Sequence, residues 1–258
     1  MKNPTRRAGK LLSILTFSVA IILFLSFSPG KKPSHLTSDR KGTLILNSVA
    51  ARGTTLSMAD SSRLNSLFGS LQLDSLGLSA AAYHKAIKGF LNLVENGQVA
   101  NPGILSIIDF SLPSNQRRLF IVDTYNGRLL FNTLVAHGRN SGMVLPTHFS
   151  NRRNSFMSSL GFYVTGEPFF GQHGYSLRLE GMEKGVNDNI FNRAIIMHPA
   201  DYVSEDHIRQ WGYLGRSEGC PAIPEDLNRP IIDVIRGGSC IFVYSPDTKY
   251  LHRSRLAS

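Results

Sequence analysis

The sequence predicts a mainly β domain with a few helices, preceded by an amphipathic helix. Three observations lead to this prediction. A stretch with apolar residues at helical spacing ends at Asn96-Gly97, where the period changes. Short runs rich in β-branched and aromatic residues follow from residue 104 onward. Loops rich in Gly, Ser, Asn and His separate these runs, and loops on a rigid β scaffold commonly carry functional sites.

The leading helix is expected to begin near Ser79 and to end at Asn96-Gly97. Its apolar residues recur every four positions and form one broad packing face, at Leu78, Ala82, Ala86, Phe90 and Val94. Strands are then expected at residues 104–110, 118–123, 128–136, 161–165, 175–179, 194–197 and 239–244. Tyr125-Asn126-Gly127 is a hairpin signal. Only one later helix is expected, at residues 225–236, because acidic residues open it and Gly237-Gly238 closes it.

Residues 1–30 are expected to be an export signal and not part of the fold. Residues 1–10 carry four basic residues and no acidic one, and residues 11–27 carry no charge. A helix of that length reaches roughly 25 Å, the short end of a membrane span. A cleaved signal peptide and a retained membrane anchor both fit this pattern. Residues 31–77 are expected to be a linker, with a short strand at residues 43–49, before a catalytic domain at residues 78–250.

The net charge of +10 is concentrated at the N-terminus. Residues 1–41 contain eight basic residues and one acidic residue, so the rest of the chain carries only +3. A mildly basic exported domain suits an anionic envelope polymer, and no basic stripe indicates nucleic-acid binding. Two cysteines are too few for a disulfide scaffold. Cys240 is expected to be buried in an apolar strand, although a Cys220–Cys240 disulfide is an alternative.

The strongest chemical signal is the pair His198 and Cys220. His198 closes an apolar run, and Cys220 lies twenty-two positions later in a glycine-flanked turn. A cysteine becomes a nucleophile when a nearby base or positive charge stabilises its thiolate. If the fold brings the two side chains together, the pair is suited to acyl transfer. The N–H groups of Gly219 and Cys220 are candidate oxyanion donors, and Ser217 is expected to bond within the turn or to a substrate.

Several segments occur in an order that resembles a known family. They are Ala136-His137-Gly138-Arg139-Asn140-Ser141-Gly142, Phe149-Ser150-Asn151, Gly171-Gln172-His173-Gly174-Tyr175, Met197-His198 and Gly215-Arg216-Ser217-Glu218-Gly219-Cys220-Pro221. Over residues 79–246 the pattern resembles the YkuD-like L,D-transpeptidases, in the branch of murein L,D-transpeptidase catalytic-domain proteins. The resemblance implies a β-sandwich with a Cys220 nucleophile and a His198 base. It also implies a place in the bacterial cell envelope, on the periplasmic side, either secreted or anchored by the N-terminal segment.

The resemblance implies a reaction and its partners. Cys220 would form a thioester with a peptidoglycan stem peptide, D-alanine would leave, and an amine acceptor would take the acyl group. This chemistry needs no cofactor and no metal. The implied partners are stem peptides, together with the inner membrane if the N-terminal segment stays uncleaved. His173 and Arg216 are candidate substrate-binding residues, Arg216 through a carboxylate, whereas His137 is expected to be structural.

The sequence departs from the commoner family pattern at three positions. Glu218 stands where many members have a His, Ala222 where an Arg is frequent, and Pro199 where a Gly is frequent. These differences leave the Cys and the His in place. They bear on the contacts with the donor peptide and on the balance between transfer and hydrolysis.

Three other functions compete with this interpretation. A cell-wall carboxypeptidase or hydrolase would use the same Cys and His with water as the acceptor, and the sequence does not separate the two. A zinc site would use His137, His173, His198 and Cys220, but the sequence has no compact ligand pair. A non-catalytic envelope-binding module would not need Cys220 at all.

Overall fold

In the computed structural model, which describes residues 58–258, eight strands form one sheet in the order β3-β2-β1-β8-β4-β5-β6-β7. The strands are β1 (Ile104–Asp109), β2 (Leu119–Asp123), β3 (Arg128–Thr133), β4 (Gly161–Gly171), β5 (Gly174–Gly181), β6 (Ile196–Pro199), β7 (Ala222–Ile223) and β8 (Cys240–Tyr244). The pairs β1–β8 and β6–β7 are parallel, and the others are antiparallel. The mainly β fold is confirmed. Where the resemblance implies a β-sandwich, the hydrogen-bonded strands form one continuous sheet.

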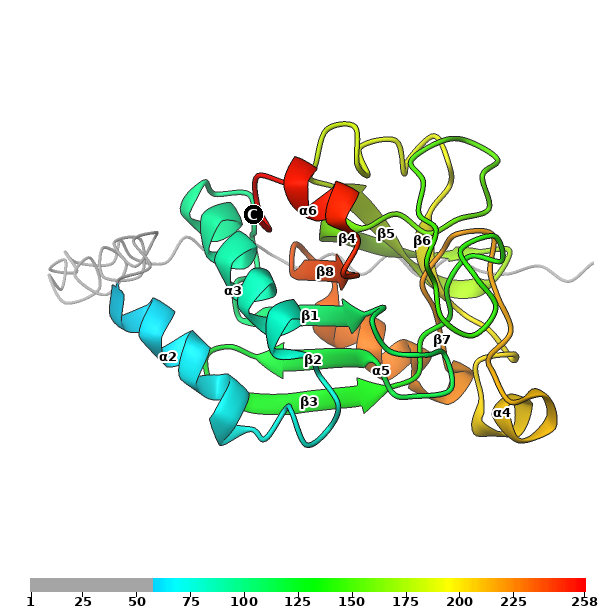
Figure 1. Ribbon diagram of the computed structural model, residues 1–258, viewed down its shortest axis with the longest axis horizontal. Coiled ribbons are helices and arrows are strands. Elements are labelled where there is room, and N and C mark those ends of the chain that lie inside the picture. The colour runs from blue at the N-terminus through cyan, green and yellow to red at the C-terminus, as the bar shows by residue number, and fades with distance from the viewer. Residues whose placement is uncertain (1–57) are drawn as a thin grey trace, which may run out of the picture. The chain divides into compact units, whose positions relative to one another are not determined.

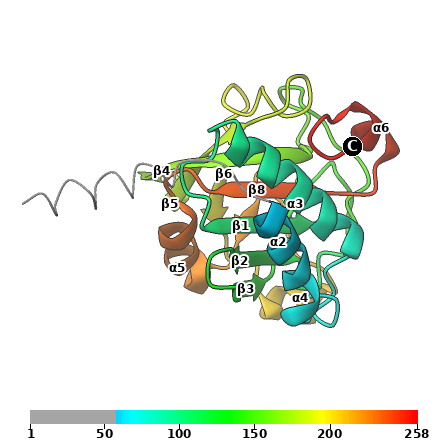
Figure 2. The same ribbon diagram turned by 90° about the vertical axis from the view of Figure 1, so that its left-hand side faces the viewer.

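The described helices are α2 (Met58–Ser70), α3 (Ala80–Glu95), α4 (Glu205–Trp211), α5 (Glu225–Ile235) and α6 (Thr248–Arg253). The expectation of a single later helix is wrong, because α4 and α6 form as well as α5. Figures 1 and 2 show α3 and α5 on opposite sides of the strands β1 and β8. This position explains why every residue of β8 is buried.

The helix α3 forms where the four-residue period predicts it. Ser79 caps its N-terminus by accepting a hydrogen bond from the Ala82 N–H. Eight of its sixteen residues are buried. One of these is Gly89, where a Cβ atom would lie 2.1 Å from Phe162 of β4. Phe162 in turn stacks on Phe242 of β8, with ring centroids 4.2 Å apart, so the glycine allows helix and sheet to meet closely.

The helix α2 lies within the segment predicted as a linker. Leu64 and Leu67 of α2 are buried in the main hydrophobic core, and Phe68 packs beside Tyr83 of α3 with ring centroids 5.2 Å apart. The linker predicted over residues 31–77 therefore includes a helix that belongs to the domain. The four serines of α2 hide this, because serine favours turns and caps over helix interiors.

The expected export signal at residues 1–30 and the expected strand at residues 43–49 lie outside the described residues. Between Met58 and Ser258, no helix has both the length and the apolar character needed to cross a bilayer.

Candidate active site

The strand β6 presents His198 on the face opposite the core. Met197 is fully buried in the core, and side chains alternate along a strand, so Ile196 and His198 share the other face. His198 itself is only 3% exposed. Its Nδ1 lies 2.8 Å from the Pro199 carbonyl oxygen. Because that oxygen can only accept, Nδ1 carries the proton and Nε2 is left as a base.

The turn that carries Cys220 is held by Ser217. The Ser217 hydroxyl accepts a hydrogen bond from the Gly219 N–H (3.0 Å) and donates one to the Cys220 carbonyl (2.6 Å). Gly219 has a φ of +123°, and a Cβ atom there would lie 2.7 Å from the Met157 carbonyl oxygen. Glycine is therefore required at this position. Of the two expected oxyanion donors, the Gly219 N–H is already engaged with Ser217.

Strand pairing brings this turn to His198. β7 begins two residues after Cys220 and pairs with β6 in the register His198–Ala222. The His198 N–H also donates to the Pro221 carbonyl, at 3.4 Å. The expected meeting of the segments around residues 198 and 220 is thus a consequence of a two-residue strand that the sequence pattern does not reveal.

The Cys220 sulfur is half-buried and faces the start of β6. Its S–H donates to the Ala194 carbonyl oxygen at 3.7 Å, and it accepts a hydrogen bond from the Ile196 N–H. Ala194 has a φ of +54°, a left-handed conformation that is uncommon for a residue other than glycine. Within residues 58–258, no hydrogen bond joins the side chains of Cys220 and His198.

Burial sets the protonation states of the pair. It raises the pKa of the Cys220 thiol, although the Ile196 N–H and the Arg193 charge act in the opposite direction. Burial lowers the pKa of His198, and the charge of His173 lowers it further, against the raising effect of the Pro199 carbonyl. The resting pair at neutral pH is therefore a neutral thiol and a neutral imidazole.

His173 lies in the turn between β4 and β5, next to His198. Its ring stacks on that of His198, with centroids 4.3 Å apart and an interplanar angle of 23°. His173 also lines a cleft of about 920 Å³ over the face of β4, β5 and β6, which we call the β4–β6 cleft. Ala194, which accepts from the Cys220 thiol, lines it too. The thiol and the imidazole thus each contact a residue that lines this cleft, although neither Cys220 nor His198 lines it.

Arg216 lies away from the β4–β6 cleft. Its Nη1 donates to the carbonyl oxygens of Arg139 (3.3 Å) and Gly142 (3.4 Å), and it is not one of the cleft-lining residues. The neighbouring Glu218 is exposed and pairs with Arg139 at 3.5 Å. Arg216 therefore supports a loop in this structure, and the cleft contains a different arginine, Arg178.

Arg193 is a residue of the site that sequence reasoning missed. Its guanidinium donates to the Ser150 and Met157 carbonyls and to the hydroxyls of Ser155 and Ser159. A Cβ atom on Gly219 would lie 3.0 Å from its Nη2. Arg193 therefore ties the segment 150–159 to the turn of the candidate nucleophile.

Tyr202 is a second residue without a sequence signal. Burial and the neighbouring charge of Cys220 raise the pKa of its phenol to about 12. The phenol is therefore protonated at neutral pH and can donate a hydrogen bond.

His137, the remaining histidine of the candidate zinc ligands, already has partners at both ring nitrogens. His137 is fully buried, its Nδ1 lies 2.8 Å from Arg118 Nη2, and its Nε2 lies 3.0 Å from the Gly142 carbonyl oxygen. His137 is thus structural, as expected. Among residues 58–258, no three His, Cys, Asp or Glu side chains are grouped so that they could hold a metal ion. Both cysteines are free, and Cys240 is fully buried in β8.

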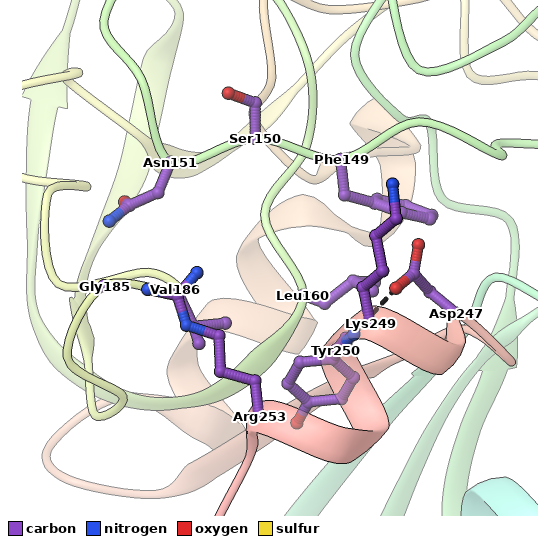
Figure 3. A pocket seen from close by; sticks show the side chains of 10 residues that line it. All are labelled: Phe149, Ser150, Asn151, Leu160, Gly185, Val186, Asp247, Lys249, Tyr250 and Arg253. Atoms are coloured by element: carbon purple, nitrogen blue, oxygen red, sulfur yellow. Dashed lines mark hydrogen bonds between the residues drawn. The ribbon is translucent and has the colours of Figure 1, made fainter.

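A smaller pocket of about 230 Å³ lies between α6 and the segments 149–151 and 185–186 (Figure 3). Lys249 and Arg253 of α6 line it, together with Ser150 and Asn151. The Ser150 carbonyl accepts from Arg193, and the Asn151 side chain donates to Asp188 at 2.7 Å. The segment 149–151 thus contacts both Arg193 and Asp188, and the pocket contains none of the predicted site residues.

This chain is distantly similar to several solved structures. An L,D-transpeptidase from Mycobacterium smegmatis is 13% identical, with 55% of this chain and 59% of that chain covered and a TM-score of 0.35. An L,D-transpeptidase from Stackebrandtia nassauensis is 12% identical, with 72% and 78% covered and a TM-score of 0.34. A helical cell shape determining protein from Campylobacter jejuni is 12% identical, with 70% and 62% covered and a TM-score of 0.38. This chain spans less than two thirds of the first of these chains.

The comparison with family models is decisive. A search of curated protein sequences finds no match. The family model described as YkuD_2, L,D-transpeptidase catalytic domain, matches residues 74–244, which is more than half of the chain. The match includes the Cys220 turn, His198 and the β4–β6 cleft. The chain therefore belongs to the family of L,D-transpeptidase catalytic domains.

Proposed function

We propose that the protein is a cysteine-dependent peptidoglycan L,D-transpeptidase, with Cys220 as the nucleophile and His198 as the general base. One observation carries the proposal: a half-buried thiol and an imidazole whose Nε2 has no hydrogen-bond partner among residues 58–258 lie on adjoining segments, and each contacts a residue that lines the β4–β6 cleft. Membership of the family supports the reaction class. The acyl donor is a stem peptide, and the acceptor is an amine of a second stem peptide.

The reaction proceeds in two acyl transfers. His198 Nε2 accepts the thiol proton as Cys220 Sγ attacks the carbonyl between an L-configured residue and the terminal D-alanine. The C–N bond then breaks, His198 returns the proton to the departing amine, and a thioester remains. The acceptor amine attacks the thioester and gives a proton to His198, the C–S bond breaks, and the sulfur regains its proton. The imidazole is unchanged over the cycle.

The protonation states of the site residues favour this order of reaction steps. A base must be unprotonated before attack, and burial keeps the pKa of His198 below its ordinary value. The thiol loses its proton only during attack, because burial raises its pKa. The developing oxyanion needs donors. The Cys220 N–H has no acceptor among the described residues, and the protonated Tyr202 phenol is the second candidate.

The test is the mass of the intact protein after incubation with a carbapenem, followed by peptide mapping. We expect a single adduct on the peptide that contains Cys220. Cys220→Ser removes the adduct, whereas Cys240→Ala retains it and is the matched control, since Cys240 is buried in β8. An adduct on any other residue, or none on the folded wild-type protein, would refute the assignment.

A second measurement separates transfer from hydrolysis. A donor tetrapeptide is incubated with and without an amine acceptor, and the products are identified by mass spectrometry. Transfer gives a cross-linked product that depends on the acceptor, whereas the competing hydrolase would give only the trimmed tripeptide. We expect the cross-linked product.

We place the reaction on the periplasmic side of the bacterial envelope, with the N-terminal segment acting as an export signal or an anchor. The four basic residues before an uncharged stretch support export. Fractionation of cells and N-terminal sequencing of the mature protein test both points. A full-length protein in the cytoplasmic fraction would contradict them.

A further inference from the structure

Arg193 is a half-buried cation without a carboxylate partner. All four acceptors of its guanidinium are neutral: the carbonyl oxygens of Ser150 and Met157 and the hydroxyls of Ser155 and Ser159. None of the ion pairs between Met58 and Ser258 includes it. Burial lowers the pKa of Arg193, which means that the surroundings disfavour its charge. Because a desolvated cation without a counter-ion is costly, an anion that forms beside it is favoured.

The guanidinium lies against the turn of Cys220. A Cβ atom on Gly219 would lie 3.0 Å from Arg193 Nη2. The residues after Arg193 border the sulfur, because the Ala194 carbonyl accepts from the thiol at 3.7 Å and the Ile196 N–H donates to the sulfur. The thiol and the guanidinium are therefore held by the same short segment.

Two ionisable groups act on the charge of Arg193, the Tyr163 phenol and the Cys220 thiol. Tyr163 is buried, and burial raises the pKa of its phenol well above the ordinary value, so it stays uncharged. The Cys220 thiol loses its proton in the proposed reaction, which makes the sulfur an anion. The thiolate is thus the counter-ion that Arg193 lacks at rest.

The other ionisable groups around the sulfur do not supply a positive charge at rest. His198 is neutral, because burial lowers its pKa, and it takes up the thiol proton only during attack. Tyr202 is a protonated phenol. Burial raises the pKa of the thiol and the charge of Glu218 adds to this, although Glu218 is exposed and already forms an ion pair. Arg193 is the cation that acts against both effects.

Four hydrogen bonds fix the guanidinium in this position. Nη1 bonds at 2.7 and 2.6 Å and Nη2 at 3.2 and 2.5 Å, all to the segment 150–159. The same segment binds the turn of the nucleophile, because the Ser158 hydroxyl donates to the Gly219 carbonyl at 3.3 Å. The Met157 carbonyl, which accepts from Arg193, is also the atom that a Cβ on Gly219 would meet first. A lysine could supply the charge here but not the planar fork of donors.

We propose that Arg193 is a positioning residue that acts as the counter-ion of the Cys220 sulfur during attack. The S–H bond breaks, the proton passes to His198 Nε2, and the electron pair stays on the sulfur beside the guanidinium. The bonds from Arg193 to the segment 150–159 keep the two charges in a fixed arrangement. The role in catalysis rests on the proposed function, whereas the effect on the sulfur can be measured without a substrate.

The experiment measures the reactivity of the thiol against pH. Cys220 is alkylated with iodoacetamide from about pH 6 to about pH 10, and the midpoint of the rate profile gives the pKa of the thiol. All samples carry Cys240→Ala, so that Cys220 is the sole cysteine. The variants are Arg193→Gln, which removes the charge, Arg193→Lys, which keeps it, and the control Arg255→Gln. Arg255 is exposed beyond α6 and belongs to none of the ion pairs of the described domain.

A nearby cation favours the thiolate, so loss of the charge must raise the midpoint. We expect Arg193→Gln to raise it by about one pH unit and to slow carbapenem acylation at neutral pH about tenfold, the matching loss of thiolate. Arg193→Lys should keep the midpoint within about 0.3 unit of the wild type and still slow acylation, because the fork is lost. Arg255→Gln should change neither value. An unchanged midpoint in Arg193→Gln, or an equal rise in Arg193→Lys, would overturn the proposal.

Ser159→Ala separates the charge of Arg193 from its hydrogen bonds. It removes one bond and keeps the charge, so acylation should slow about two- to fivefold while the midpoint stays unchanged. If circular dichroism shows that Arg193→Gln is unfolded, this variant still decides, because a raised midpoint would mean that loosening alone shifts the thiol and would overturn the proposal. A wild-type protein without a carbapenem adduct on Cys220 would instead refute the proposed function, and the alkylation midpoints would still test the charge of Arg193.

Discussion

The region around α3, β1 and β8 is held by apolar packing, whereas the loops around Cys220 are held by hydrogen bonds. In the first region every residue of β8 is buried, and Phe162 packs between Gly89 and Phe242. In the second, which we call the site loops (residues 137–159, 182–195 and 213–221), Arg193 makes four side-chain hydrogen bonds. Stability is thus concentrated in one region and the placement of reactive atoms in the other, so mutations should separate the two.

The largest effect on stability is expected for Phe162→Ala. Removing a buried phenylalanine leaves a cavity, which costs about 3–5 kcal/mol of unfolding free energy. Urea denaturation followed by circular dichroism measures it. The control is Phe170→Ala on the same strand, where the side chain is 75% exposed and the change should stay within about 0.5 kcal/mol. A cost for Phe162→Ala below about 1.5 kcal/mol would show that the apolar region does not carry the stability.

The largest effect on the reaction, apart from loss of Cys220 itself, is expected for Gly219→Ala. The new Cβ atom would meet the Met157 carbonyl, so the turn must shift, and a displacement of about 1 Å can cost on the order of 100-fold in rate. The rate of carbapenem acylation measures it. Gly212→Ala is the matched control: its φ is +83°, but no atom lies within 4 Å of the added Cβ. Equal rates for the two variants would mean that the close approach at Gly219 is not needed.

The same comparison explains what the sequence could predict. The helix α3 and the strands β1, β2 and β8 follow from apolar periodicity, because their residues face one core. The pair His198 and Cys220 was predicted from its motif. Arg193 was not, since its four acceptors are backbone carbonyls and serines 34 to 43 positions earlier, and no spacing rule links them.

The prediction for Arg216 depends on contacts that the sequence does not show. Arg216 lies next to the motif in sequence, yet its guanidinium is bonded to loop carbonyls. Arg178 lies on a strand that the sequence predicts, but only the register of β5 against β6 reveals that it faces the cleft beside Ile196. Register depends on pairing between distant segments, and the pattern of a single strand does not contain it.

Lowering the pH is expected to have an effect of intermediate size on the unfolding free energy. Burial and the charge of Arg118 lower the pKa of His137 to about 3, so the unfolded state binds a proton that the folded state does not between that value and 6.5. Stability from this residue is therefore lost as pH falls, by about 2 kcal/mol between pH 7 and pH 5. Urea denaturation at both pH values measures it. His137→Asn should reduce the loss of unfolding free energy between pH 7 and pH 5, whatever the stability of the variant at pH 7. An unchanged loss would refute the role given to His137.

The smallest effect is expected at the caps of two helices. Ser79 and Ser204 each accept a hydrogen bond from a backbone N–H three residues on, at 3.1 Å and 3.2 Å. α3 buries eight residues, whereas α4 buries none. Ser79→Ala should therefore lower the global unfolding free energy by about 1 kcal/mol. Ser204→Ala should change it by less than about 0.5 kcal/mol, because α4 can fray without opening the core.

Hydrogen exchange gives the measurement that distinguishes the two caps. Ser204→Ala should speed exchange only within residues 205–211, while Ser79→Ala should speed it throughout the core strands. Equal global losses would mean that α4 unfolds together with the core. The absence of buried residues in α4 also explains why it escaped prediction: its Ser204 cap, acidic first turn and Gly212 terminus are all present, but a helix without an apolar face gives no periodic signal.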